Sequence, residues 1–387
     1  MLKNNPGLLH IGLFIITLIT TTLAGAEWMY GRLLFYGEET MTWEDFKAGF
    51  QFSIPFLLIL TFHEFGHYFT ARSHQIKVSL PYYFPLWLGF MASHSFGTMG
   101  AFIRIKEQIF SRKHYFDVGV SGPVAGFVIA ILVIWFGFTN LPDTSYIFEI
   151  HPEYAEYGAD YAKYVYEDKE GISVKLGDNL IYWFFKNYVV EDPQLLPHPN
   201  EIIHYPYLLA GYLALLFTAL NLLPIGQLDG GHITYGLFGK RYHAIISRVL
   251  FTAFLFYAGL GLLSIRDLEE VSAGGLLNFT FYMALYVFFL YVCAVSMFRR
   301  KNDRLLFAMI IMASQFLLAS FFNVEGYNGW LLFGLIIGRF LGVDHPKTPE
   351  NSPLSLNRKI IGWIALVIFI LCFSPRPLIF EVSGVNL

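Results

Sequence analysis

Long apolar runs alternate with short polar connections along most of the chain. A helix that crosses the hydrocarbon core of a bilayer needs about 20 consecutive apolar residues. The chain contains nine apolar runs: seven predict membrane-spanning helices clearly, and the last two do so more weakly. These segments are Leu8–Ala26, Gly49–Ala71, Phe116–Phe138, Tyr205–Leu223, Ala244–Ser264, Leu276–Phe298, Leu305–Phe322, Trp330–Val343 and Ile360–Phe373.

This pattern predicts an all-α polytopic membrane protein with about 8–9 transmembrane helices, which places the chain in a lipid bilayer. Composition agrees, because only 14% of the residues are charged whereas soluble proteins carry about 25%. The net charge of −3 offers no basic surface and argues against nucleic-acid binding. The two cysteines, Cys293 and Cys372, both lie in apolar runs, which excludes a disulfide framework or a cysteine zinc finger.

The first run has two interpretations. Lys3, the apolar core and the Ala24-Gly25-Ala26 triplet also fit a cleavable signal peptide. The run is longer than a usual signal core, so a retained helix is the favoured prediction.

Basic residues predict the orientation of the chain. If the N-terminus is cytoplasmic and every run crosses the membrane, the inner connections hold 17 Lys and Arg residues and the outer ones hold 8. Cytoplasmic connections carry the excess of basic residues, so we expect this orientation in a bacterial inner membrane or an equivalent one. The acid-rich connection 141–204 then lies outside, as an extramembrane cap or hairpin of unpredicted fold.

One apolar run carries three ionisable residues. His63-Glu64-Phe65-Gly66-His67 matches H-E-x-x-H. On a helix, residues four apart share a face, so both imidazoles can bind one zinc ion while Glu64 acts as general base. Charge inside a membrane is costly and usually marks function. The competing interpretation is a satisfied polar cluster without a metal.

A catalytic zinc site needs a third protein ligand and one open position. The segment from Asn221 to His232 contains Asp229, one of only 7 among 29 acids that fall on the inner side or in the membrane. Pro224 and the glycines of this segment break the helix, as expected where irregular backbone lines a cavity. The runs Gly49–Ala71 and Tyr205–Leu223 both lead inward, so both motifs are expected at the same membrane face.

The paired motifs HEFGH and N-x-x-P…L-D-G-G-H resemble the site-2 protease family of intramembrane metalloproteases, over roughly residues 50–239. The resemblance implies one zinc ion per chain, bound by His63, His67 and Asp229, with Glu64 as general base. It also implies that Gly97–Ile105 forms a small re-entrant β-hairpin near the active site, and that Ser121–Gly126 opens the next core helix. Neither a PDZ domain nor a CBS domain is evident in the sequence.

We therefore expect three parts. Residues 1–47 hold the first span or signal peptide and an outer loop, residues 48–240 form the metalloprotease core with the connection 141–204, and residues 241–387 add C-terminal helices of unassigned role.

Further residues have two interpretations each. Asn221 is a candidate for substrate binding or oxyanion stabilisation, or else an amide that joins helices. His232 is expected to support a ligand by hydrogen bonding, with direct ligation as the alternative. Gly97, Gly100, Ala101 and Ile103 are candidates for binding an extended substrate along a strand edge.

The predicted reaction is hydrolysis of peptide bonds within or near membrane-spanning segments of other proteins, either regulators already shortened by another protease or leftover signal peptides. A metal-ion transporter is the first alternative, because intramembrane His and Asp can line an ion path. An inactive, protease-like membrane scaffold is the second. Substrate identity and oligomeric state are not predicted.

Overall fold

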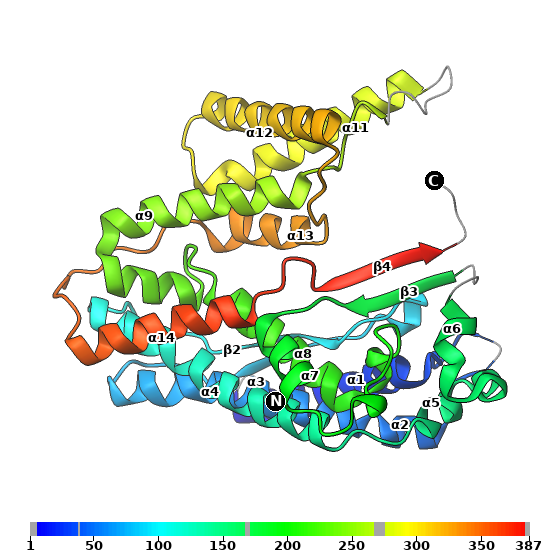
Figure 1. Ribbon diagram of the computed structural model, residues 1–387. Helices are drawn as coiled ribbons and strands as arrows, with labels where there is room; N and C mark the ends of the chain where they lie inside the picture. The colour runs from blue at the N-terminus through cyan, green and yellow to red at the C-terminus, as the bar shows by residue number, and fades with distance from the viewer. Residues whose placement is uncertain (1–5, 38, 167–170, 267–274, 384–387) are drawn as a thin grey trace. The chain divides into compact units, whose positions relative to one another are not determined.

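The computed structural model describes residues 6–37, 39–166, 171–266 and 275–383 as a mostly helical protein (Figure 1). It divides into two compact units, each described by itself below. The first comprises Met1–Ile109, Ser121–Leu220 and Ala365–Leu387, and the second Phe110–Val120 and Asn221–Ile364. Helices α4 (Arg112–Thr139), α8 (Pro206–Leu222) and α14 (Leu356–Cys372) each run from one unit into the other.

The first unit is built around two neighbouring apolar helices, α1 (Pro6–Tyr30) and α3 (Phe50–Ser73), with the short α2 (Trp43–Ala48) between them in sequence. A capping box begins α2: the Asp45 N–H donates to Thr42 Oγ1, and the Thr42 N–H donates to Asp45 Oδ2. Hydroxyl groups join the two long helices, because Thr22 Oγ1 and Ser53 Oγ lie 2.8 Å apart. Such small polar contacts are typical of helix pairs in membranes.

A β-hairpin packs on α1 and α3. Strands β1 (Tyr82–Leu86) and β2 (Gly97–Phe102) pair antiparallel, with a register shift after Tyr83. Gly97 has φ +75°, and an added Cβ there would lie 2.3 Å from the Thr21 Cα of α1, so only glycine fits. Tyr83 Oη lies 2.8 Å from Thr61 Oγ1 of α3. The prediction of a small two-stranded sheet is confirmed, but Gly97–Ile105 holds only its second strand, which ends at Phe102; the first strand, Tyr82–Leu86, lies outside the predicted range.

The connection 140–205 between α4 and α8 forms a small folded layer. A core of Ile147, Ile150, Tyr154, Tyr161 and Val165 holds it together. Its elements are α5 (Ser145–Ile150), η3 (Pro152–Asp160), α6 (Tyr161–Tyr166), β3 (Gly171–Leu176), α7 (Leu180–Tyr188), η4 (Pro193–Leu195) and η5 (Ile202–His204).

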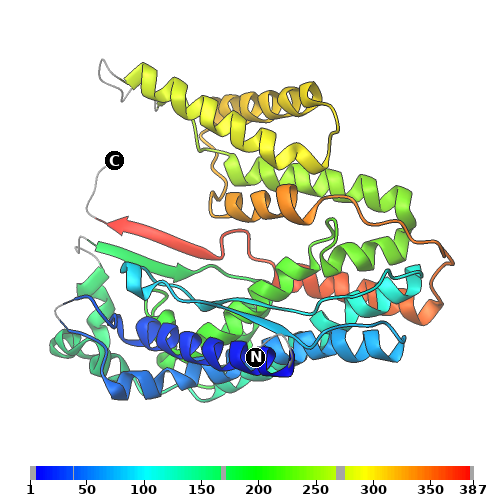
Figure 2. The same cartoon turned by 180° about the vertical axis from the view of Figure 1, so that it is seen from behind.

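A second two-stranded sheet, which the sequence pattern did not predict, joins this layer to the C-terminal region. Strand β3 pairs antiparallel with β4 (Leu378–Ser383), with Val174 opposite Phe380 (Figures 1 and 2).

The second unit packs the remaining helices around polar contacts. Its elements are α9 (Asp229–Gly259), α11 (Gly275–Cys293), η6 (Ala294–Ser296), α12 (Lys301–Phe322), α13 (Trp330–Leu335), the π-helical η7 (Ile336–Leu341) and part of α14. Buried Gln315 of α12 accepts a hydrogen bond from Tyr286 of α11 at 2.9 Å and donates to two carbonyls of α9 at 3.1 and 2.8 Å. Figure 2 shows α11 and α12 side by side.

Six helices among the described residues are long and apolar enough to cross a membrane, which makes the protein a multi-pass membrane protein. The prediction of 8–9 spans is not confirmed. The run Tyr205–Leu223 forms the 17-residue α8, because Pro206 begins it and the chain leaves the helix before Pro224. The spans are Gly7–Tyr30, Trp43–Ser73, Arg112–Thr139, Asp229–Gly259, Leu277–Ser296 and Lys301–Phe322, with shorter apolar helices at Pro206–Leu222 and Trp330–Leu341.

Candidate metal centre

Two histidines of α3 face each other across one helical turn. His63 Nε2 and His67 Nε2 lie 3.1 Å apart, as the i, i+4 spacing requires. Glu64 follows the first histidine, and its Oε1 lies 3.9 Å from His63 Nε2. The three residues are buried, with 5–7% of their surface exposed, inside a membrane-spanning helix. Ionisable residues inside a membrane-spanning segment are costly and usually mark function.

Small residues of α4 let the imidazoles pack directly against this helix. A Cβ added at Gly122 would lie 2.1 Å from His67 Nε2, and one added at Gly126 would lie 3.1 Å from His63 Cβ. The helices themselves touch, because a Cβ at Gly66 would lie 2.6 Å from the Ser121 carbonyl oxygen. The small-residue run Ser121–Gly126 does not open this helix as predicted, because α4 begins at Arg112; from inside α4 it lets the helix pack directly against the two imidazoles.

The geometry of this half-site fits zinc. Two nitrogen ligands of a tetrahedral zinc ion, at bond lengths of about 2.0–2.1 Å, stand about 3.3 Å apart. The observed 3.1 Å also suits an N–H···N hydrogen bond. The distance alone therefore admits both a zinc ion and a direct imidazole pair.

Asp229 belongs to the second unit, where it is the first residue of α9 and half-buried. It follows a non-helical break, residues 223–228, rather than standing on α8. The break is fixed by hydrogen bonds: the Gly226 N–H donates to Ser247 Oγ at 2.8 Å, and that hydroxyl donates to the Val343 carbonyl at 2.6 Å. A carboxylate in the first turn also suits the helix dipole, so position alone does not decide its role.

His232, one turn along α9, is held by a second histidine. His232 Nδ1 lies 2.8 Å from His345 Nε2, and His345 Nδ1 lies 2.7 Å from the Pro346 carbonyl oxygen. The carbonyl can only accept, so His345 Nδ1 carries a proton; in the neutral rings its Nε2 then accepts from His232 Nδ1. This leaves His232 Nε2 without a proton. The contact matches the supporting role predicted for His232, which stays a prediction.

His345 itself was missed by the sequence analysis, because its segment reads as an ordinary polar loop. Its ring stacks on Tyr235 with centroids 3.9 Å apart and is 8% exposed. Burial, followed by the nearby His232, lowers the pKa of His345 to about 3. Only the spatial neighbours of this histidine distinguish it from a surface residue.

The remaining candidates lie on the expected elements. Asn221 is half-buried in the last turn of α8, and Ala101 lies opposite Tyr83 in the hairpin. Gly100 has φ +105° with open space where a Cβ would be, whereas Ile103 lies beyond the end of β2. Their roles in substrate binding stay predictions, as does that of Gly97, whose close contact with α1 gives it a structural task.

Comparison with known proteins identifies this arrangement as that of a membrane metallopeptidase. The sequence profile described as Peptidase family M50 matches residues 51–266, more than half of the 387-residue chain. The chain therefore belongs to peptidase family M50, the site-2 protease family, whose members use zinc.

Several relatives are named as zinc proteases. "Probable zinc metalloprotease EGY2, chloroplastic" from Oryza sativa subsp. indica is 25% identical over 279 residues, 71% of this chain and 42% of the relative. "Probable zinc metalloprotease EGY1, chloroplastic" from Arabidopsis thaliana is 28% identical over 183 residues, 47% and 28% of the two chains. The matches thus span less than half of these relatives' own length. No solved structure matches the chain.

Proposed function

We propose that this protein is an intramembrane zinc metalloprotease that hydrolyses peptide bonds within or near membrane-spanning segments of other proteins. The observation that carries the proposal is the buried triplet His63, Glu64 and His67 on a membrane-spanning helix, with the two Nε2 atoms 3.1 Å apart. Membership of peptidase family M50 supports it.

The proposed ligands of the single catalytic zinc ion are His63, His67 and Asp229. Two imidazoles and one carboxylate form a known catalytic set that leaves a fourth position for water or substrate. The proposed helix directions bring the ends of both motifs to one membrane face. His232, hydrogen-bonded to His345, would support the ligand set from α9.

The proposed reaction assigns the proton transfers to Glu64. When bound, zinc polarises the scissile carbonyl and lowers the pKa of the attacking water. Glu64 accepts a proton from that water as its oxygen bonds to the carbonyl carbon. It then returns the proton to the amide nitrogen as the C–N bond breaks, leaving a carboxylic acid and an amine. Burial of Glu64 keeps competing water away from this exchange.

A helical substrate must first be extended, since its carbonyls are hydrogen-bonded within the helix. Strand β2 is paired with β1 alone among the described strands, and we propose that its other edge receives the substrate as an added strand. Gly100, Ala101 and Ile103 lie along this stretch. Asn221, close to the helix break, is the proposed donor to the substrate backbone or oxyanion.

The proposed setting is a bacterial inner membrane or an equivalent one, with the active site toward the cytoplasm. Counting α8, the helix Trp330–Leu341 and α14 with the six long helices supports 8–9 spans. The proposed substrates are single-span regulators already cut once, or remnants of signal peptides. In the proposed division of the chain into residues 1–47, 48–240 and 241–387, catalysis belongs to residues 48–240.

The test uses the full chain in lipid vesicles with a single-span substrate. Glu64→Gln should keep its zinc and lose at least about 100-fold in cleavage rate, in keeping with the loss of a general base. His67→Ala should lose both zinc and cleavage. Substantial cleavage by the Glu64→Gln variant would refute the assigned base. Zinc flux into the vesicles without cleavage would indicate a transporter. A wild-type protein that shows neither zinc flux nor cleavage would indicate a scaffold.

A further inference from the structure

A second group of ligand-type side chains lies in the connection 140–205, at the end of α1. His204 Nε2 lies 3.4 Å from Glu201 Oε2 and 3.5 Å from His151 Nε2, and His151 Nε2 lies 3.8 Å from Glu201 Oε2. Glu201 and His204 are buried, with 1% and 7% of their surface exposed. Three possible metal-ligand atoms, from two separate stretches of chain, therefore form a nearly equilateral triangle.

The size of the triangle matches a metal ion. An ion at its centre would lie about 2.1 Å from each of the three atoms, whereas zinc bonds to His and Glu measure about 2.0–2.2 Å. The edges are too long for a good hydrogen bond between a protonated carboxyl and an imidazole, which is about 2.7–2.8 Å. The spacing therefore suits coordination better than proton sharing.

The chemistry of the facing atoms agrees. His204 Nδ1 lies 2.6 Å from the Met29 carbonyl oxygen, so Nδ1 donates, and in the neutral ring Nε2 presents a lone pair to the cluster. Glu201 Oε2 has no hydrogen-bond partner among the described residues. A lone pair and an orphaned carboxylate oxygen at 3.4 Å repel each other unless a cation lies between them.

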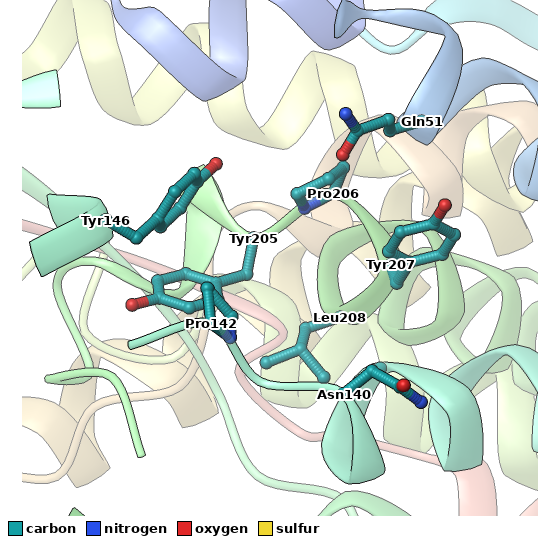
Figure 3. A pocket seen from close by; sticks show the side chains of 9 residues that line it. Gln51, Asn140, Pro142, Tyr146, Tyr205, Pro206, Tyr207 and Leu208 are labelled. Carbon is teal, nitrogen blue, oxygen red and sulfur yellow. The ribbon is translucent and has the colours of Figure 1, made fainter. Parts of the chain in front are cut away.

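The ligands are held firmly by their surroundings. Glu201 precedes the short η5 and His204 is its last residue; the His204 N–H donates to the Glu201 carbonyl at 2.9 Å and closes the turn. Figure 3 shows Tyr146 and Tyr205 at a neighbouring pocket; the Tyr146 hydroxyl donates to the His204 carbonyl at 2.8 Å. Glu153 Oε1 lies 3.4 Å from His151 Nδ1, which orients the other ring nitrogen toward the cluster.

The cluster opens into a cavity of about 770 Å³. Two further acceptor oxygens on its lining residues, Glu27 Oε2 and Asn200 Oδ1, are buried without a hydrogen-bond partner among the described residues. Buried acceptor oxygens that receive no hydrogen bond are stabilised by a nearby cation, so this cavity lining favours a bound metal ion. The open side also gives a bound ion access to a fourth ligand.

We infer that His151, Glu201 and His204 form a second divalent transition-metal site, for which zinc is the best-fitting ion. It is separate from the catalytic centre. The two sites lie about 25 Å apart along the helices. Thr22 of α1 contacts Ser53 of α3, and from this contact Met29 lies seven residues away in one direction and His63 ten residues away in the other. A metal here joins η5 and the start of η3 to the end of α1, and leaves one coordination position open toward the cavity.

The test measures bound zinc in the full chain, purified in detergent without a polyhistidine tag. The wild type should hold about two ions per chain, and His63→Ala/His67→Ala about one. Adding His151→Ala to that double variant should leave none. His151 is the ligand of choice because, with 28% of its side chain exposed, it is less buried than Glu201 and His204. The matched control is His198→Ala, which removes a histidine of the same connection that stacks on Tyr166.

Cobalt substitution of the His63→Ala/His67→Ala protein adds a reading of ligand geometry. Visible absorption typical of a low-coordinate Co²⁺ site should appear, and should vanish with His151→Ala but persist with His198→Ala. A double variant that binds neither zinc nor cobalt while eluting as a monodisperse species would overturn the site. Equal metal content with and without His151 would do the same. Neither result bears on the role of Glu64, so the protease proposal is tested separately.

Discussion

Single residues decide how much room the buried histidines have. Gly122 lies so close to His67 that an added methyl group would fall on Nε2, whereas at Gly126 it would meet the His63 Cβ at 3.1 Å and Nδ1 at 3.3 Å, a tight contact without overlap. Both glycines belong to one small-residue run on α4, yet an added methyl group would have a different effect on the histidine beside each. A pair of identical substitutions can therefore separate helix packing from occupancy of the metal position.

Gly122→Ala should abolish zinc binding at the catalytic centre and lower cleavage at least about 100-fold, because its methyl group would overlap the His67 ring and displace Nε2. Gly126→Ala should keep the zinc and most of the activity, since the contact needs a shift of only a few tenths of an ångström. Metal analysis and substrate cleavage measure both effects. Equal losses in the two variants would mean that helix packing alone is at stake.

His345 gives the second unit a pH-dependent stability. Its folded pKa of about 3 lies below the unfolded value of about 6.5. Between these values the unfolded chain binds more protons, so this contribution is complete above about pH 6.5 and is lost as the pH falls. We expect the unfolding temperature to drop from pH 7 to pH 5, and less steeply in His345→Gln. Scanning fluorimetry in detergent would measure it; parallel curves would contradict the assignment.

At the scale of elements, sequence motifs located the helices and the hairpin but not the contacts between distant segments. H-E-x-x-H is a local pattern, so His63, Glu64 and His67 could be found directly. The partners His232 and His345 are more than a hundred residues apart, and β3 pairs with a strand beyond the last helix. No local periodicity records such pairings, which is also why His151, Glu201 and His204 escaped notice.

The free edge of β2 leads to a prediction about substrate binding. Ala101→Pro or Ile103→Pro removes a backbone N–H and should cut cleavage strongly while leaving bound zinc unchanged. Met99→Ala is the control, because Met99 is 67% exposed and its backbone N–H remains. Cleavage rate and zinc content should be measured on the same samples. Normal turnover in the proline variants would remove strand addition from the mechanism.

At the scale of the whole molecule, the excess of basic residues in alternate connections predicts which ends of the helices face the cytoplasm. Cys293 and Cys372 are both buried, so a membrane-impermeant maleimide should report only on introduced thiols. Glu191→Cys, in the connection 140–205, should react in right-side-out vesicles. Arg300→Cys should react only after the membrane is opened. The reverse pattern would invert the proposed orientation and the side on which the active site opens.

The pairing of β3 with β4 also constrains the order of events during synthesis. Val174 can pair with Phe380 only after that residue, about 200 positions later, has been synthesised. Ribosomes add roughly 5–20 residues per second. The partner strand thus emerges roughly 10–40 s after β3, when α9, α11 and α12 have already left the ribosome. Throughout that interval β3 exposes an unpaired edge, and a chaperone that covers it would protect the nascent chain from aggregation.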